Sequence, residues 1–234
     1  MTTGVRRRMG VEERRRQLIG VALDLFCRRS PEDVSIDEIA AAAGISRPLV
    51  YHYFPGKLSL YEAALQRAAD DLAERFAEPC QGPLGARLLR MTGRFFDFVD
   101  EHGPGFTALM RGGPAGSPAT GALAESVRQA AYEQILAHLG TAQPSARLEL
   151  VVRSWVSLAE STALLWLDGR RIPRGDLERQ LVHGFGALVA VGAAYDKGDE
   201  GMAELFHRLL TDEPADGPFG QVAGRLTALV PSVP

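Results

Sequence analysis

One short stretch, ISRPLVYHYFPGK at residues 45–57, gathers a serine, an arginine, a histidine and two tyrosines into barely three turns of chain. The guanidinium of Arg47 can reach O6 and N7 of a guanine, and Pro48 and Leu49 offer apolar contact to a thymine methyl. The polar tips of the tyrosines and the histidine suit phosphates or base edges, and Lys57 would meet a phosphate as a point charge. This chemistry predicts contact with DNA.

A helical reading divides these side chains between two faces. Val50 and Phe54 fall on one side and, with Ile45 just before the helix, would anchor it to neighbouring helices. Taken singly, a tyrosine here is as often a core residue, and a histidine is more often an ordinary surface residue, so the prediction depends on the assembled pattern. The candidate DNA-contacting residues are Ser35, Ser46, Arg47, Pro48, Leu49, Tyr51, His52, Tyr53 and Lys57.

The preceding residues supply a second short helix and a tight turn. Ser35 is a good N-cap, Glu38 completes a capping box three residues later, and Gly44 ends the alanine-rich run. Ser46 caps the next helix, and Pro48 lies in its first turn, where a missing N–H breaks no intrahelical bond. A short capped helix, a turn and a second helix form a helix-turn-helix, here at about residues 35–54.

These motifs resemble the tetracycline-repressor (TetR) family of bacterial transcription regulators. The resemblance runs from about Val11 to Leu65, through ALDLF, VSIDEIAAAAGIS and LVYHYFPGKLSLYEAAL. It implies a three-helix DNA-binding head, a fourth helix from about Lys57, and an all-helical C-terminal domain that dimerises and binds an effector. Pro48 and Leu49 depart from the small or polar residues of many relatives, which leaves the recognised sequence open. The expected domains are a basic arm at 1–10, the DNA-binding domain at 11–70 and the effector-binding and dimerisation domain at 71–234.

The basic start of the chain, with Arg6, Arg7 and Arg8, has two open interpretations. It is either an arm that neutralises phosphates or enters the minor groove, or a solvated tail. Residues 1–57 hold 10 Arg and Lys against 7 Asp and Glu, whereas the remainder holds 16 against 22. This asymmetry is compatible with a DNA-reading end on an acidic body.

Helical periodicity continues to the end of the chain, which predicts an all-α fold. Glycine- and proline-rich breaks separate the expected helices. RGGPAGSPAT is the expected mobile loop, and a short final helix should end at Val230. The expected helices span about 57–77, 84–101, 103–111, 121–140, 144–168, 174–196 and 200–211.

Two of these helices, at about 144–168 and 174–196, are apolar around much of their circumference. Burial on more than one side predicts a two-fold four-helix dimer interface, although ordinary core helices are the alternative. The predicted dimerisation residues are Trp166, Gly184, Phe185, Leu188, Val191 and Gly192.

An effector site is expected inside the C-terminal bundle, although an aromatic stripe at helical spacing is more often plain core. Glu160 interrupts an otherwise apolar-to-small run, so its carboxylate needs either an arginine of its own chain or a polar or cationic ligand. We expect an unknown, largely hydrophobic small molecule. The predicted ligand-binding residues are Phe95, Phe96, Phe106, Met110, Tyr132, Trp155 and Glu160.

Other classes of function find little support. The chain has no GxSxG, HExxH, P-loop or strand-linked GxGxxG motif, so an enzyme is not expected. Cys27 and Cys80 do not suggest a metal site, and we expect no metal or cofactor. No signal peptide or membrane-spanning run is evident, which predicts a cytoplasmic protein. The resulting prediction is a homodimeric repressor released from a pseudo-palindromic double-stranded DNA operator by an effector. The alternative is an effector-independent, architectural DNA-binding factor.

Overall fold

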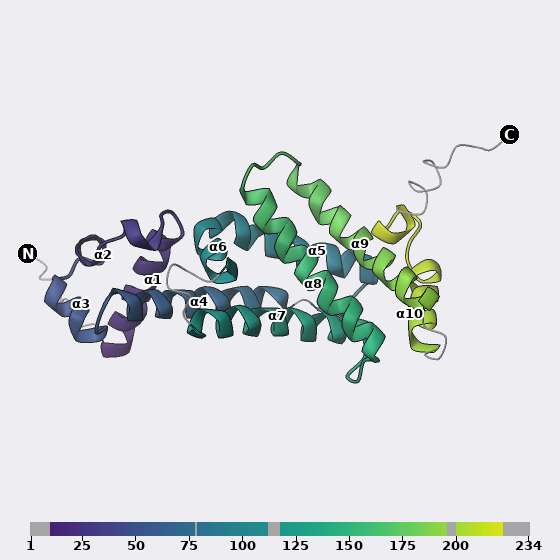
Figure 1. Ribbon diagram of the computed structural model, residues 1–234, viewed down its shortest axis with the longest axis horizontal. Coiled ribbons are helices and arrows are strands. Elements are labelled where there is room, and N and C mark those ends of the chain that lie inside the picture. The colour runs from purple at the N-terminus through teal and green to yellow at the C-terminus, as the bar shows by residue number, and fades with distance from the viewer. Residues whose placement is uncertain (1–9, 78, 112–117, 196–199, 222–234) are drawn as a thin grey trace, which may run out of the picture. The chain divides into compact units, whose positions relative to one another are not determined.

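The computed structural model describes residues 10–77, 79–111, 118–195 and 200–221, and within these ranges the chain is helical without strands (Figure 1). This confirms the all-α prediction. A single 3₁₀ turn, Pro31–Asp33, precedes the second helix. The helices are α1 (Val11–Phe26), α2 (Ile36–Ala42), α3 (Arg47–Tyr53), α4 (Lys57–Phe76), α5 (Leu84–Glu101), α6 (Gly103–Arg111), α7 (Pro118–Leu139), α8 (Ala146–Leu167), α9 (Arg174–Tyr195) and α10 (Glu200–Thr211).

The chain divides into two compact units. The first comprises Met1–Asp70 and Glu101–Ala124, and the second comprises Asp71–Asp100 and Glu125–Pro234. The first unit therefore includes α6 and the start of α7 beside the helices expected for a DNA-binding head. Helices α4 and α7 run through the boundary, so each contributes residues to both units.

The first unit forms its core where α1, α2 and α3 meet. Leu18, Ala22 and Phe26 of α1 are buried, as are Ile39 of α2 and Val50 of α3. The α2–α3 turn ends α2 as predicted. Gly44 has a φ of 67°, and the N–H groups of Gly44 and Ile45 donate to the carbonyls of Ala41 and Ala40. This Schellman arrangement satisfies the last carbonyls of α2 and turns the chain sharply into α3.

The second unit is built on the aromatic side chains of α5 and on the hairpin formed by α8 and α9 (Figure 1). Helix α10 packs against α9. Trp155 of α8 lies edge-on to Phe185 of α9 with ring centroids 5.5 Å apart, and its indole N–H donates to the carbonyl of Leu181 at 2.7 Å. These buried contacts hold α8 against α9.

Helix α8 is long and apolar enough to cross a membrane by length and composition, a test that core helices of soluble proteins also pass. In its most apolar window, 28% of the residues are buried. Several of its apolar side chains, Leu150, Leu158 and Leu165, are therefore exposed.

The helices observed after residue 57 lie close to those expected. The main difference is at α7, which begins at Pro118 rather than near residue 121, because proline is well suited to the first turn of a helix. The arginines of the N-terminal arm and the expected end of the final helix at Val230 lie outside the described residues. Most of the RGGPAGSPAT stretch does so too.

Candidate DNA-binding site

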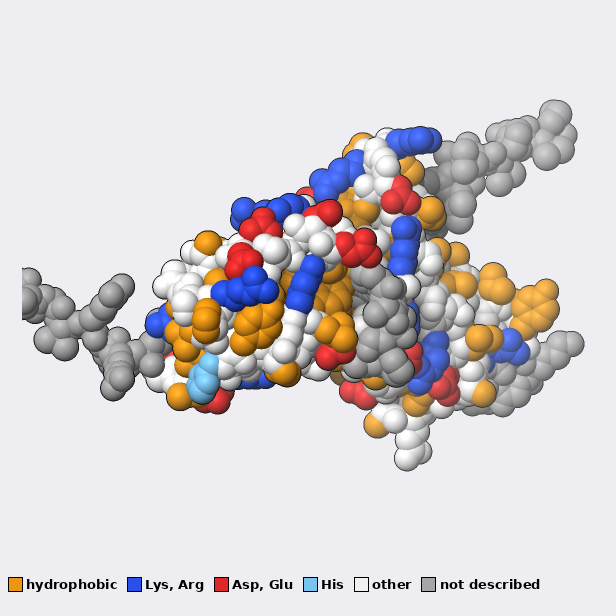
Figure 2. Space-filling model, turned by 60° about the vertical axis from the view of Figure 1, so that its left-hand side comes forward, with side chains coloured by type: hydrophobic (Ala, Val, Ile, Leu, Met, Phe, Trp, Pro, Cys, Tyr) orange, Lys and Arg blue, Asp and Glu red, His pale blue; other side chains and the backbone are white. Residues whose placement is uncertain are grey.

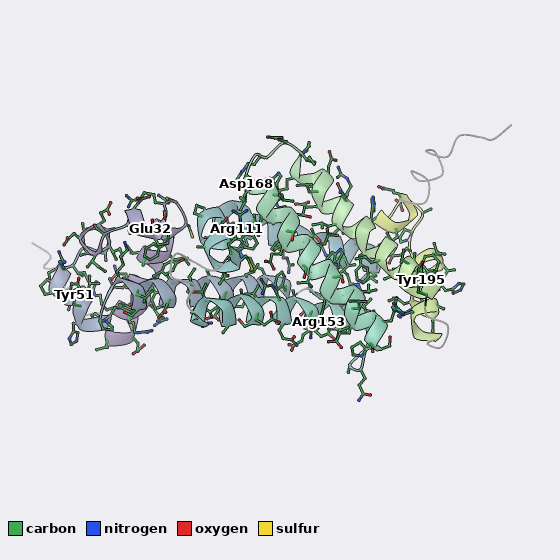
Figure 3. All side chains as sticks on the ribbon, in the orientation of Figure 1. Glu32, Tyr51, Arg111, Arg153, Asp168 and Tyr195 are labelled. Carbon is green, nitrogen blue, oxygen red and sulfur yellow. The ribbon has the colours of Figure 1, made fainter. Side chains whose placement is uncertain are left out.

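Helix α3 is held by one face and exposes the other. Val50 has no exposed surface and Phe54, its C-cap, is 2% exposed, whereas Tyr51 is 42% exposed. Arg47 and Pro48 are also exposed, and Figure 3 shows Tyr51 on the α3 end of the first unit. The clamped face fixes the helix, so the opposite face is available to a partner.

Arg47 and Tyr51 form one cluster with Asp37 of α2. The Arg47 guanidinium donates to Asp37 Oδ2 at 2.9 Å and to the Tyr51 hydroxyl at 3.4 Å. Its carbon also lies 5.7 Å from the centre of the Tyr51 ring. These interactions raise the pKa of Arg47, with the Tyr51 hydrogen bond as the largest cause. The cluster holds a bidentate donor at the exposed start of α3.

The other predicted residues on and beside α3 differ in how far their side chains are exposed. Leu49 and Tyr53 are half-buried and His52 is exposed. The His52 and Tyr53 rings meet edge to face with centroids 5.1 Å apart. Lys57 donates through Nζ to the main-chain carbonyl of Glu32 at 3.3 Å.

The two predicted capping serines differ in what their side chains do. The Ser35 hydroxyl accepts from the Glu38 N–H at 3.2 Å, and the Glu38 carboxylate accepts from the Ser35 N–H at 2.8 Å, which confirms the capping box. Ser46 is the N-cap of α3 but makes no side-chain cap bond. Its carbonyl accepts from the N–H groups of Leu49 and Val50 instead. The predicted N-cap position of Ser46 is therefore confirmed, without a side-chain cap bond.

The charge on this surface is mixed rather than uniformly basic. Figure 2, which turns the α2–α3 end toward the viewer, shows acidic side chains interspersed with basic ones. Arg29 pairs with Glu38 at 2.9 Å, as Arg47 does with Asp37. Asp37 is not among the residues predicted from the sequence. Its position ten residues before an exposed arginine, across a two-helix turn, was the available signal.

The predicted ligand-binding residues are mostly packed side chains, and they are divided between the two units. Phe106, which is fully buried, and Met110 belong to the first unit. The other five belong to the second unit. Phe95 and Phe96 meet edge to face with centroids 5.4 Å apart. Tyr132 is 7% exposed and lies under the Arg153 guanidinium at 4.3 Å.

Glu160 has a partner within its own chain. Its two carboxylate oxygens accept from Arg128 Nε at 2.8 Å and Nη2 at 3.0 Å. Of the two partners that the sequence left open for this carboxylate, the structure provides the arginine. The hydrogen bond to Glu160 is also the largest cause of the raised pKa of Arg128.

The second unit has two cavities, and both lie away from the predicted ligand-binding residues. One, of about 290 Å³, is lined by residues that include Arg87, His138 and Arg208. The other, of about 440 Å³, lies at the turn between α8 and α9 and includes Trp166 in its lining. Neither cavity is lined by any of the seven predicted ligand-binding residues.

The predicted dimerisation residues fall into two groups, one packed within the subunit and one exposed or half-buried. Phe185 has no exposed surface and Trp166 is 8% exposed, with its ring edge-on to Phe96. A Cβ added at Gly192 would lie 2.7 Å from Met202, and one added at Gly184 would lie 3.6 Å from Leu158. Phe185, Trp166 and Gly192 therefore face their own subunit, whereas Gly184 is half-buried beside Leu158. Leu188 is half-buried, and Val191 is 58% exposed.

The chain is similar to proteins of one family over most of its length. Residues 18–64 match the model described as bacterial regulatory proteins, tetR family, and residues 84–188 match the tetracyclin repressor-like C-terminal domain. A TetR-family transcriptional regulator from Streptomyces coelicolor is 77% identical, with 94% of this chain and 99% of that chain covered and a TM-score of 0.89. The transcriptional activator FasR of Mycolicibacterium smegmatis is 27% identical over 168 residues, which are 70% of this chain and 77% of that protein.

These relatives are transcription regulators rather than enzymes, in agreement with the expectation from the sequence. Their shared architecture is the one described above, a helix-turn-helix head followed by a helical C-terminal domain. The exposed face of α3 lies within the part of the chain that matches the N-terminal family model. The chain is a DNA-binding transcription regulator of the TetR family.

Proposed function

We propose that the chain acts in the cytoplasm as a homodimeric repressor, which a small, largely hydrophobic effector releases from a pseudo-palindromic operator. The observation that carries the DNA-binding part is the two-faced packing of α3. Val50 is completely buried while Arg47 and Tyr51 are exposed on the same short helix. The amphipathic anchoring leaves the N-terminal end of α3 to enter a major groove.

The DNA-contacting side chains have distinct proposed roles. Arg47 reads a guanine, while Pro48 and Leu49 contact a neighbouring thymine methyl. Ser46, whose hydroxyl makes no cap bond, and Tyr51, His52, Tyr53 and Lys57 meet phosphates or neighbouring bases. Ser35, at the N-terminus of α2, lies where the N–H groups of that helix end meet a phosphate of the DNA backbone. Arg47 leaves Asp37 when it binds a base, so recognition exchanges one charged hydrogen bond for others.

An exposed apolar stripe supports the homodimer. On α8, Leu150, Leu158 and Leu165 are 58%, 43% and 73% exposed and recur every seven or eight residues. On α9, Val191 and Tyr195 are 58% and 72% exposed. We name these five residues the α8–α9 stripe. A repeat of this length keeps side chains on one face of a helix, and a second copy that covers the stripe would form a four-helix interface.

A two-fold dimer also suits the operator. Two heads related by the two-fold axis read two half-sites, and the doubled phosphate contacts raise affinity steeply. An effector that binds one arrangement of the body better than the other shifts the spacing of the heads and lowers operator affinity. One observation favours activation as the second candidate, because FasR, which is 27% identical, is an activator.

The test is selection of bound fragments from genomic DNA with purified protein, repeated with Arg47→Ala. We expect the wild-type protein to enrich one pseudo-palindrome and the variant to lose about 1–3 kcal/mol of discrimination at one base pair. Arg179→Ala, which removes an arginine of α9, is the matched control. Unchanged sequence preference in Arg47→Ala would overturn the proposed base contact.

Transcription from a template that carries the selected site then separates the candidates. A repressor lowers the transcript and an activator raises it. An operator affinity that no bound small molecule changes would instead support the effector-independent architectural factor.

A further inference from the structure

The 440 Å³ cavity at the turn between α8 and α9 has both apolar and charged walls. Leu165, Trp166, Ile172 and Leu177 provide an apolar part, Arg170 and Arg171 provide two cationic groups, and Asp168 provides one carboxylate. Figure 3 locates the turn, since it labels Asp168 there. A cavity of a few hundred Å³ with apolar walls and a few polar groups is typical of small-molecule sites.

The aromatic wall is held rigidly. The Trp166 indole N–H donates to the carbonyl of Ile172 at 3.0 Å, and the ring meets Phe96 edge-on with centroids 5.4 Å apart. The Arg170 guanidinium carbon lies 4.8 Å from the centre of the same indole. A ring fixed from three sides can line the cavity without further loss of side-chain entropy when a ligand binds.

The turn itself adopts an uncommon backbone conformation at Arg170, whose φ is 47°. A side chain with a Cβ costs roughly 1–2 kcal/mol in the left-handed region. Arg170 donates to Asp100 of α5 at 2.6 Å, and this ion pair together with the Trp166 contact offsets part of that cost. The charge of Arg170 is therefore already balanced by a carboxylate.

Arg171 differs from its neighbour. Among the described residues it has neither a hydrogen-bond acceptor nor a carboxylate partner, and it is exposed. Its side chain lies beside Gly169, since a Cβ added there would lie 3.3 Å from the Arg171 Nε. The stem thus lies across a glycine that leaves room for it. A guanidinium without a paired carboxylate at the edge of a partly apolar cavity is complementary to an anion with an apolar body.

We propose that this cavity binds a small aromatic or branched apolar molecule that bears one carboxylate or a similar anion. The apolar body lies against Trp166 and Leu177, and the anion pairs with Arg171. Occupation also affects Arg170, since an anion at the turn competes for its guanidinium with Asp100, which ends the first segment of the second unit. This regulatory step rests on the proposed function, whereas the site itself does not.

Binding is tested with the full-length dimer by calorimetric titration of 1-naphthoate, with 1-naphthamide as the neutral analogue and inorganic phosphate as the anion without an apolar body. We expect naphthoate to bind at least tenfold more tightly than the amide, and phosphate to bind weakly. Arg171→Ala should weaken naphthoate binding about tenfold, about 1.4 kcal/mol, and abolish the preference over the amide. Arg171→Lys should restore part of it, and Arg179→Ala should change nothing.

Several outcomes would overturn the site. These are an unchanged dissociation constant in Arg171→Ala, an equal loss in Arg179→Ala, or no binding of naphthoate to the wild-type dimer. The last would mean that the second copy fills the cavity. Thermal unfolding of each variant checks that the fold is retained.

Operator binding separates this inference from the proposed function. The wild-type protein and Arg171→Ala should bind the operator equally without ligand, and naphthoate should alter operator affinity for the wild type alone. If naphthoate binds through Arg171 but operator affinity does not change, the regulatory step is overturned and the binding site is still supported. A wild-type protein that binds no operator would overturn the proposed function and leave the naphthoate titration valid.

Discussion

Arg47 at the start of α3 donates to Asp37 of α2 at 2.9 Å, so the one arginine on the exposed face of the recognition helix is paired with a carboxylate in the absence of DNA. The side chains are 55% and 65% exposed. Asp37 therefore does two things. It orients the guanidinium, and it places a negative charge on the face proposed to meet DNA phosphates.

Replacing Asp37 by Asn should tighten binding to non-specific DNA and reduce the preference for the operator. The gain should be about two- to fivefold at low salt, because an exposed charge interaction is worth up to about 1 kcal/mol. The preference falls because Arg47 loses the group that orients it. Fluorescence anisotropy with operator and scrambled duplexes measures both. Asp24→Asn on α1 is the control, and an equal gain in that variant would refute a specific role for Asp37.

The capping box of α2 makes the stability of the head depend on pH. The Glu38 carboxylate accepts from the Ser35 N–H and pairs with Arg29, and these interactions, the Ser35 bond first, lower its pKa from 4.5 to about 2. A lowered pKa gives stabilisation that is complete above 4.5 and is lost as the pH falls toward 2. Denaturation curves of wild type and Glu38→Gln should therefore differ at pH 7 and converge near pH 2. A constant difference would contradict this assignment.

Ser35→Ala tests the other half of the box. Loss of the hydroxyl that accepts from the Glu38 N–H should cost about 1 kcal/mol of stability. Ser46→Ala is the matched control, since the Ser46 side chain makes no cap bond and its loss should cost little. Urea denaturation followed by circular dichroism measures both. Equal losses would show that the two serines act alike.

The two thiols should differ in reactivity. Cys27 is 7% exposed, and burial, followed by the nearby Asp24 carboxylate, raises its pKa from 9.0 to about 12. Its sulfur also lies 3.0 Å from His102 Nδ1. Cys80 is exposed. Because the thiolate is the nucleophile, Ellman's reagent at pH 8 should titrate one thiol in the folded protein and two in guanidinium. Mass spectrometry should locate the fast label on Cys80, and fast labelling of Cys27 would refute the burial argument.

Local signals in the sequence were sufficient to predict the helix-turn-helix. The bonds at Ser35, Glu38 and Gly44 span three to five positions, so local spacing alone determines the ends of α2. The two faces of α3 follow from the same kind of short-range periodicity, since Val50 and Phe54 are one turn apart.

Pairings between helices could not be predicted in this way. Arg128 lies 32 residues before Glu160 on another helix, and no local pattern specifies that contact. Periodicity also shows that the helices at 144–168 and 174–196 have more than one apolar face, but not which face turns inward. Phe185 and Trp166 were therefore assigned to the dimer interface although they pack inside the subunit. The left-handed backbone at Arg170 has no glycine to indicate it, because Gly169 stands one residue earlier.

Removing Glu160 should destabilise the second unit. Its side chain is 17% exposed and that of Arg128 is 31% exposed, so Glu160→Ala leaves a partly buried guanidinium without its bidentate acceptor. The expected loss is about 1–3 kcal/mol. Glu149→Ala, which breaks the exposed Glu149–Arg153 pair, should cost under about 0.5 kcal/mol. In a double-mutant cycle, Arg128→Ala with Glu160→Ala should cost less than the two single changes together, and strict additivity would contradict a direct pairing.

The α8–α9 stripe predicts which surface change separates two copies. Val191 is 58% exposed on α9, so glutamate there should leave the subunit folded but place a charge in an apolar interface. Sedimentation should then show the monomer mass, and operator affinity should fall because each head binds alone. Leu210→Glu on α10 introduces the same charge at a side chain that is 60% exposed outside the stripe, and should remain dimeric. A dimeric Val191→Glu, or a monomeric Leu210→Glu, would place the interface on another surface, because the same charge can separate two copies only where an apolar contact holds them together.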